Sequence, residues 1–240
     1  MKITASSFKL RANVPEGRKR FPISQPVSNT PPLGLSGGHV AGAVLYADRS
    51  AALVHHPRRG MIAEIGVGYG DFSEELLTSL QPLEFHAFDL FPWQPDYVLW
   101  GRPAWETLQG KSHHEFFLDR FATSIDNGQS FVHMGDSVET LADIPDQYFD
   151  MIYVDGDHSL EGVSRDAVAA ARTLKPDGYL VFNDYVMFDH INDCHYGIVH
   201  VVNDMCVNQG WRVEYLALDA GMHCDICIRR FPGEVDKNVD

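Results

Sequence analysis

The fold is decided by the stretch MIAEIGVGYGDFSEELL at residues 61–77, in which three alternating glycines join two regular segments. The apolar run MIAEI predicts a short buried strand, and the segment from Asp71 to Leu80 predicts a helix. Glycine permits tight turns and close approach of a ligand, and the first turn of a helix leaves N–H groups free. The stretch therefore predicts a strand, a glycine loop and a helix, which is typical of nucleotide-type cofactor sites.

Strand-like apolar runs alternate with helical segments along the rest of the chain. Near-continuous apolar strands separated by helices predict a mostly parallel sheet covered on both faces. Two final strands follow each other without a helix and predict an antiparallel hairpin. We therefore expect an α/β fold, a Rossmann-like, doubly wound, mostly parallel seven-stranded sheet with an antiparallel hairpin at its C-terminal edge. The strands are expected at 61–65, 83–88, 130–134, 150–155, 179–184, 211–218 and 223–230, and helices at 39–54, 71–80, 112–125, 138–142, 160–174 and 196–209.

The N-terminal part of the chain differs in composition from the rest. Residues 1–60 carry a net charge of +7 and residues 61–240 a net charge of −21. Residues 1–38 contain five prolines and little apolar periodicity. We expect an extended Pro-rich arm over residues 1–38, which packs on the acidic body of its own or a neighbouring copy, or else forms a loosely ordered tail. Residues 39–240 are expected to form one domain.

The composition excludes several classes of protein. The chain has 240 residues, 45% of them hydrophobic, and a net charge of −14, so a wholly disordered chain and a general nucleic-acid binder are excluded. No apolar run approaches the ~18 residues that a membrane span needs, and the N-terminus has no apolar signal region. Four cysteines do not form a disulfide scaffold. We expect a cytoplasmic protein without nucleic-acid or membrane partners, and the basic arm suggests a homodimer or higher oligomer.

The spacing of the glycines distinguishes between two cofactor classes. The dinucleotide fingerprint is G-x-G-x-x-G, whereas this chain has G-x-G-x-G, with Asp71 at the position of the third glycine. A pyrophosphate would be repelled by Glu64 and Asp71, and a cationic cofactor would be attracted. Asp89 ends the next strand, where an acidic residue accepts hydrogen bonds from ribose hydroxyls.

The pattern from Glu64 to Gly70, E-x-G-x-G-x-G, resembles the first motif of class I S-adenosylmethionine (SAM)-dependent methyltransferases. The ligand of that family carries an ammonium and a sulfonium, which agrees with the local acidity. In that family an acidic residue after the third strand contacts adenine. Asp136 and Ser137 are at the matching position here, and a role as helix N-cap is the alternative for them. The resemblance implies a cofactor site formed by Glu64, Gly66, Gly68, Gly70, Asp89, Asp136, Ser137 and Asp155.

Polar clusters follow two later strands that are separated by one helix. Asp155 follows the apolar run IYV, and the pair Asn183 and Asp184 follows LVF. If these strands are parallel neighbours, their carboxyl ends bring the three side chains around one point. Two carboxylates and an amide oxygen suit a hard divalent ion such as Mg²⁺.

The stretch VDGDHSLEGVSRD…LKPDGYLVFNDY within residues 154–185 resembles metal-dependent sugar O-methyltransferases, such as the macrocin and mycinamicin enzymes. Catechol and caffeoyl-CoA O-methyltransferases share a related metal arrangement. The resemblance implies that Asp155, Asn183 and Asp184 hold the metal, although the sugar enzymes usually have two acids in place of Asn-Asp. It implies His158 as the general base, with Asp157 as the alternative.

These features predict a SAM-dependent, Mg²⁺-assisted O-methyltransferase acting on a hydroxyl of a small molecule or glycan, with a sugar or natural product favoured. The alternatives are an NAD(P)-type oxidoreductase on a similar fold, a non-catalytic SAM-binding module, and another metal-dependent reaction. Five aromatic residues between 91 and 105 predict that residues 91–125 form a lid or acceptor wall, with core packing as the alternative.

Four further groups are given structural roles. His55 and His56 are expected in a solvated turn, the His113–Glu115 stretch at an exposed helix start, and Arg165 with Asp166 as a solvated pair. One C-x-x-C within a strand, Cys224 and Cys227, indicates buried inert thiols rather than a zinc site.

Overall fold

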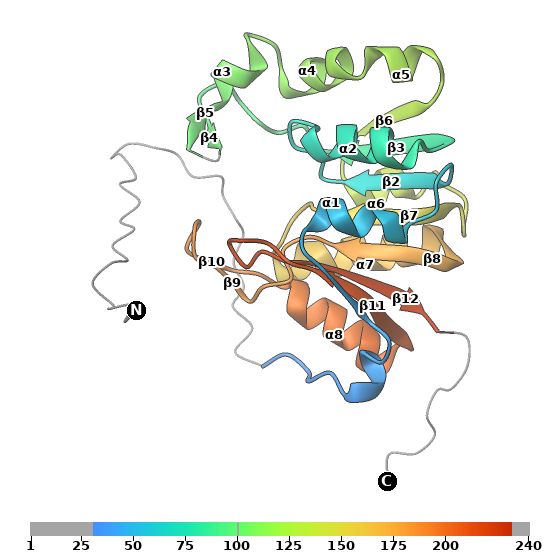
Figure 1. The fold of residues 1–240 in the computed structure, drawn as a ribbon. Coiled ribbons are helices and arrows are strands. Elements are labelled where there is room, and N and C mark those ends of the chain that lie inside the picture. The colour runs from blue at the N-terminus through green and yellow to red at the C-terminus, as the bar shows by residue number, and fades with distance from the viewer. Residues whose placement is uncertain (1–30, 100, 232–240) are drawn as a thin grey trace.

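The computed structural model describes residues 31–99 and 101–231 and centres on one eight-stranded sheet (Figure 1). The order across the sheet is β1-β11-β12-β8-β7-β2-β3-β6. All neighbouring pairs are parallel except β11–β12 and β12–β8, which confirms the mostly parallel, doubly wound fold with an antiparallel C-terminal hairpin. The strands are β1 (Val44–Tyr46), β2 (Met61–Ile65), β3 (Glu84–Asp89), β6 (Ser130–Met134), β7 (Phe149–Val154), β8 (Leu174–Phe182), β11 (Trp211–Ala217) and β12 (Asp225–Arg230).

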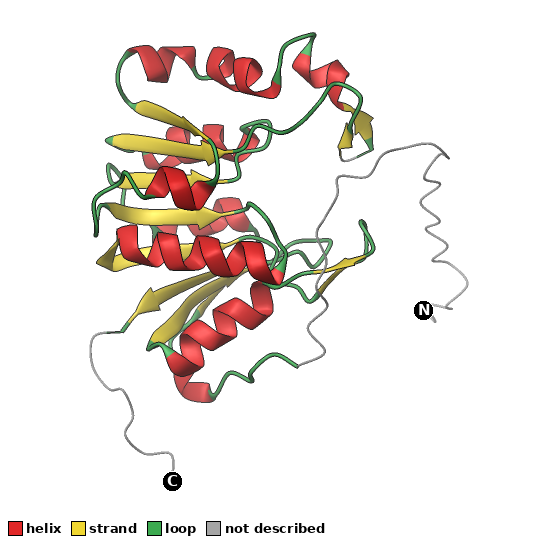
Figure 2. Ribbon diagram, turned by 180° about the vertical axis from the view of Figure 1, so that it is seen from behind, coloured by secondary structure: helices red, strands yellow, loops and turns green. Residues whose placement is uncertain are grey.

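Helices cover both faces of this sheet, as Figure 2 shows from behind. Two small hairpins lie beyond the carboxyl end of β2, at the left in Figure 1: β4 (Val98–Leu99) with β5 (Arg102–Pro103), and β9 (Phe188–Asp189) with β10 (Cys194–His195). The α-helices are α1 (Arg49–Ala52), α2 (Asp71–Leu80), α3 (Ala104–Leu108), α4 (His113–Arg120), α5 (Ala122–Asp126), α6 (Ser137–Leu141), α7 (Leu160–Thr173) and α8 (Ile198–Asn208).

The eighth strand, β1, corrects the sequence prediction of seven strands and a helix over residues 39–54. Gly42 adopts φ +85°, which a helix cannot accommodate, and Val44–Tyr46 then pairs in parallel with β11. The β-branched and aromatic side chains of this run favour a strand. A helix begins only after Asp48, whose side chain accepts a hydrogen bond from the N–H of Ala51. The predicted edge hairpin is therefore covered by β1 on its outer side.

Other predicted bounds hold closely, with two differences in detail. The bounds of β2, α2 and β6 are those expected from the sequence. The predicted helix over 112–125 is divided into α4 and α5 at Phe121. The helix α7 ends at Thr173, one residue before the predicted bound, and β8 begins at once, since Leu174 already pairs with Phe149 of β7.

The core consists of two apolar clusters, one on each face of the sheet. Leu141, Val163 and Val202 bring α6, α7 and α8 onto one face. Leu76 and Phe117 bring α2 and α4 onto the other. Burying one such side chain contributes ~1.5–3 kcal/mol, so the sheet is a rigid platform whose carboxyl end can carry a site.

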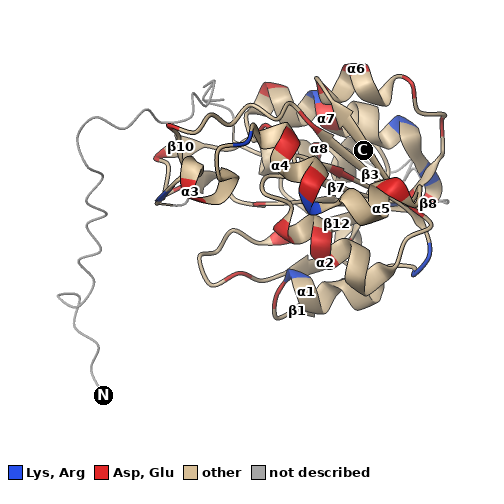
Figure 3. Ribbon diagram, turned by 90° about the horizontal axis from the view of Figure 1, so that it is seen from above, with Lys and Arg blue, Asp and Glu red and all other residues tan. Residues whose placement is uncertain are grey.

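The described end of the predicted arm packs on the body of the domain. The amide nitrogen of Asn203 in α8 donates to the carbonyl oxygen of Leu33, and Leu35 packs against the core. Residues 1–30 of the arm lie outside the described residues. Acidic positions outnumber basic ones on the ribbon in Figure 3. No helix among the described residues has the length and apolarity needed to cross a membrane.

Candidate active site

The glycine loop lies where the sequence predicts it, between β2 and α2. Gly66, Gly68 and Gly70 all adopt positive φ, and Gly70 is the N-cap of α2. A Cβ at Gly66 would lie 2.1 Å from the carbonyl oxygen of Asp155. Glycine is therefore required at this position, because the loop is in direct contact with the end of β7.

Asp89 fixes the glycine loop to the end of β3. One carboxylate oxygen, Oδ2, accepts a hydrogen bond from the N–H of Val67 at 2.8 Å, and Oδ1 accepts one from the N–H of Phe91 at 2.5 Å. Burial raises the pKa of Asp89, and these backbone hydrogen bonds counteract the shift. Asp89, which is predicted to bind the ribose hydroxyls, thus lies beside the loop, and its carboxylate is oriented by the two backbone N–H groups.

His113 forms a second support of the loop that the sequence analysis missed. This residue is buried at the start of α4, which corrects the expected exposed helix start. Its Nε2 donates to the carbonyl oxygen of Gly68 at 2.7 Å, and its ring stacks on Trp93 with centroids 4.4 Å apart. A signal was present, since His113 lies within the aromatic-rich connection after β3.

The predicted lid region 91–125 is partly packed and partly exposed. Phe91 is buried, whereas Trp105 is 57% exposed. Trp93 is in edge contact with Tyr69 of the glycine loop. Trp100 lies outside the described residues. The aromatic connection therefore borders the cofactor loop, and its role as a lid or acceptor wall stays a prediction.

Glu64 lies behind the glycine loop in the protein interior. It is 1% exposed and accepts a hydrogen bond from Ser73 Oγ in α2 at 2.5 Å. Burial raises the pKa of Glu64 well above its ordinary value, and the charges of Asp155 and Asp89 act in the same direction. The structure thus gives Glu64 a partner that ties β2 to α2.

Asp136 and Ser137, the predicted adenine ligands, lie at the start of α6. Asp136 is the N-cap of this helix and accepts from the N–H of Val138 at 2.9 Å, which is the alternative that the sequence left open. Arg165 forms an ion pair with Asp136, so the expected Arg165–Asp166 pair was wrong. Asp166 is instead 5% exposed and hydrogen-bonded by Ser137, and burial raises its pKa to about 6.

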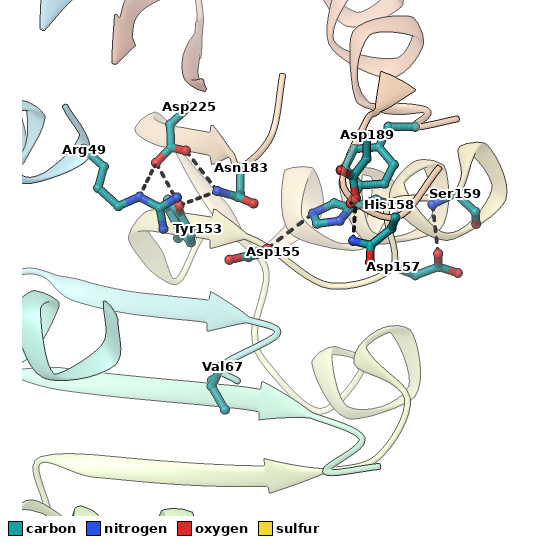
Figure 4. Close-up of polar contacts among 12 residues, drawn as sticks. Arg49, Val67, Tyr153, Asp155, Asp157, His158, Ser159, Asn183, Asp189 and Asp225 are labelled. Carbon is teal, nitrogen blue, oxygen red and sulfur yellow. Dashed lines mark hydrogen bonds and ion pairs between the residues drawn. The ribbon is translucent and has the colours of Figure 1, made fainter. Parts of the chain in front are cut away.

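The strands β7 and β8 are parallel neighbours, as predicted, so the residues that follow them lie at the same edge of the sheet. His158 Nε2 lies 3.3 Å from Asp155 Oδ1 (Figure 4). Asp157 is exposed, and its Oδ1 accepts a hydrogen bond from the N–H of Ser159 at the start of α7. Of the two candidate bases, His158 faces Asp155 and Asp157 serves the helix start.

Opposing effects act on the pKa of His158. Burial alone would lower the pKa of His158, but the contact with Asp155 and the charge of Asp184 raise it above the ordinary value. The ring packs on Tyr196 with centroids 4.5 Å apart, and the N–H of Gly197 donates to the His158 carbonyl. These contacts hold the imidazole beside Asp155.

Asn183 belongs to a buried polar network that the sequence did not reveal (Figure 4). It is 3% exposed, and its Nδ2 donates to Asp225 Oδ1 at 3.0 Å and to the Tyr153 hydroxyl at 3.2 Å. The Tyr153 hydroxyl donates to Asp225 Oδ2, and Arg49 pairs with the same oxygen at 3.5 Å. The network brings α1 and β12 behind the acidic strand ends and fixes the orientation of the Asn183 amide.

Asp184 occupies an unusual backbone position directly after β8. Its φ is +55°, a conformation that costs energy for a residue other than glycine and that is often found at functional sites. Burial raises the pKa of Asp184 to about 6, and Asp155 adds to the shift, while His158, His223 and Arg49 oppose it.

The metal site predicted at Asp155, Asn183 and Asp184 stays a prediction, and a second group of metal-ligating side chains lies elsewhere in the described residues. Among the described residues, one group of acidic, His or Cys side chains has all its donor atoms within 4.8 Å of one another, and it is Asp189, His190 and His223. Asp155 and Asp184 do not complete such a group with His158.

One histidine and two cysteines outside the site, His56, Cys224 and Cys227, are buried in the core. His56 is buried and bonded to the Tyr215 hydroxyl at 2.8 Å, which corrects the expected solvated turn. Its burial, with the neighbouring charge of His55, lowers the pKa of His56 to about 3. Cys224 and Cys227 are free and buried, as expected.

Comparison with known proteins agrees with this arrangement. Residues 63–185 match a family described as a methyltransferase domain. A SAM-dependent methyltransferase from Mesorhizobium loti is similar in structure, with a TM-score of 0.50 and 15% identity, over 75% of this chain and 95% of that protein. A tRNA methyltransferase from B. subtilis has a TM-score of 0.51 and 11% identity, over 77% of this chain and 66% of that one. At these identities the similarity shows a shared fold.

Some structurally similar proteins are considerably longer than this chain. The chain spans 51% of the pyocyanin biosynthetic protein PhzM, with a TM-score of 0.49 and 14% identity over 72% of this chain. The search of curated proteins found no significant sequence match to this chain.

Proposed function

The chain belongs to the methyltransferase domain family that its residues 63–185 match, and from that premise we propose that it methylates a hydroxyl oxygen of a small molecule or glycan. A sugar or another natural product is the favoured acceptor, on the resemblance of residues 154–185 to sugar O-methyltransferases. One observation carries the proposal. The cofactor loop at Gly66 is in contact with the backbone of Asp155, whose side chain faces His158.

In the proposed reaction the hydroxyl oxygen attacks the methyl carbon of the sulfonium in line, and the neutral thioether leaves as S-adenosylhomocysteine. Alignment of the two reactants supplies much of the acceleration. A hydroxyl is a weak nucleophile until its proton is removed, and a positioned histidine can remove it. Nε2 of His158 faces Asp155, so Nδ1 is the nitrogen left to receive the proton. Asp155 then stabilises the imidazolium that forms.

The residues present fit a hard divalent cation at the strand ends. Asp155 and Asp184 offer carboxylates, and the hydrogen bonds of Asn183 Nδ2 leave the amide oxygen as its remaining ligand atom. A cation would also relieve the repulsion from Asp155 that contributes to the raised pKa of Asp184. When bound, Mg²⁺ would supply Lewis acidity that lowers the pKa of the acceptor hydroxyl.

The test is calorimetric titration of the purified chain with S-adenosylhomocysteine, in Mg²⁺ and again in EDTA. We expect micromolar binding of the thioether, and a Mg²⁺ binding heat that is lost in Asp155→Asn. Asp146→Asn is the matched control, because Asp146 is an exposed aspartate paired with Arg172. Absence of thioether binding, with a response to NAD(P) instead, would contradict the proposal. Thioether binding without a Mg²⁺ heat would remove the metal from it.

A further inference from the structure

The group of Asp189, His190 and His223 is assembled from two segments that are distant in sequence. Asp189 ends β9 and His190 follows it, whereas His223 lies in the connection between β11 and β12. The donor atoms of all three side chains lie within 4.8 Å of one another. The sequence contains no motif that predicts this group, because its members become neighbours only when the fold places β9 beside the connection between β11 and β12.

Asp189 is oriented as the carboxylate of a metal site would be. It is 2% exposed, and its Oδ2 accepts hydrogen bonds from the Tyr196 hydroxyl at 2.8 Å and from Asn192 Nδ2 at 2.5 Å. The N–H of Ile191 donates to Oδ1 at 2.8 Å. Such outer contacts fix the direction of a ligand in metal proteins.

The two imidazoles complete the arrangement with nitrogen donors. His223 Nε2 lies 3.2 Å from Asp189 Oδ1. Two ligand atoms at ~2.0–2.1 Å from one tetrahedral ion are ~3.3 Å apart, so this separation suits a shared ion. The His190 ring stacks on that of His223, with centroids 5.1 Å apart and planes 28° apart, and His190 is exposed. An exposed side chain can rotate to bring its nitrogen closer at little cost.

We propose that Asp189, His190 and His223 bind one first-row transition-metal dication of the Zn²⁺ type, with a fourth position open to water. Two imidazoles and one carboxylate are a known ligand set for such ions. The site differs from the candidate Mg²⁺ site, whose donors are all oxygens. The bound ion would join the β9–β10 hairpin to the connection before β12, at the end of the sheet that carries the candidate active site (Figure 1).

The test uses the tag-free full chain, stripped with EDTA and titrated with Co²⁺ while visible absorption is recorded, and with Zn²⁺ in a calorimeter. We expect one equivalent of each metal to bind and Zn²⁺ to raise the melting temperature. His223→Ala and His190→Ala should each weaken binding at least ~10-fold. His195→Ala is the matched control, because His195 is an exposed histidine on the same hairpin and lies outside the group.

Asp155→Asn separates this proposal from the proposed function. It should leave Co²⁺ binding unchanged, and both histidine variants should retain thioether binding, which also shows that they fold. The proposal is overturned if no Co²⁺ binds, if His195→Ala weakens binding as much as His223→Ala, or if only Asp155→Asn abolishes it. A melting temperature that falls in His223→Ala but does not respond to metal would show an Asp189–His223 ion pair only.

Discussion

The glycine loop at 66–70 and the acidic strand ends at 155–158 and 183–184 meet at one end of the sheet, but their geometries have different origins. The loop is shaped mainly by its own glycines and by Asp89, 19 to 23 residues further along the chain, with His113 as a more distant support. The acidic ends are shaped by Arg49, Tyr196 and Asp225, which come from other parts of the fold. A site formed by the backbone can therefore be encoded largely by nearby residues, whereas a site formed by side chains depends on long-range packing.

The largest expected effect comes from changing the loop where it contacts the acidic end. In Gly66→Ala the added Cβ would lie 2.1 Å from the Asp155 carbonyl oxygen, at φ +83°. Overpacking and left-handed backbone strain together should lower the free energy of unfolding by ~3 kcal/mol or more. Denaturant titration measures this. Gly128→Ala is the control, because φ is +77° there but no atom lies within 4 Å of the added Cβ, so ~1–2 kcal/mol is expected. An equal decrease in the free energy of unfolding in the two variants would show that the loop is not closely packed against the end of β7.

A smaller loss of stability is expected when the buried polar network behind the acidic strand ends is interrupted. Tyr153→Phe removes the hydroxyl that donates to Asp225 and accepts from Asn183, and leaves buried polar atoms short of a partner. We expect the free energy of unfolding to fall by ~1–3 kcal/mol. Tyr179→Phe on the neighbouring strand should be nearly neutral, since the ring that contacts Arg229 remains and no hydrogen bond of its hydroxyl is found within the described residues. Similar losses in both variants would mean that the network does not support the strand ends.

The smallest effect distinguishes the two roles of Asp136. Asp136→Ala removes the N-cap of α6 and should cost ~1 kcal/mol of folding free energy, whereas Asp136→Asn keeps a capping oxygen and should be nearly neutral. If the carboxylate also contacts adenine, Asp136→Asn should weaken binding of S-adenosylhomocysteine several-fold at unchanged stability. Unchanged affinity in the calorimeter would contradict the adenine role and leave Asp136 as a cap.

The sequence predicted the parallel sheet, the glycine loop and the order of the polar strand ends, because hydrophobic periodicity and glycine spacing are local signals. It predicted a helix in place of β1, since the run Val44–Tyr46 is short and its pairing with β11 is a long-range contact. It also missed the burial of His56 and His113, whose partners Tyr215 and Gly68 lie far away in sequence. Patterns of neighbouring residues in the sequence do not predict contacts between residues that are far apart in it.

The pairing of β1 with β11 has a consequence for how the chain folds. Val44 and Tyr215 are about 170 positions apart, yet they are partners at the edge of the sheet. During synthesis β1 emerges long before β11, its neighbour in the sheet among the described residues, so the two strands pair only after most of the chain has been made. Contacts of such high sequence separation carry a large loop-closure entropy and slow the search for the native state. Completion of this edge should therefore be a late step of folding, after the glycine loop and its neighbouring strands have formed.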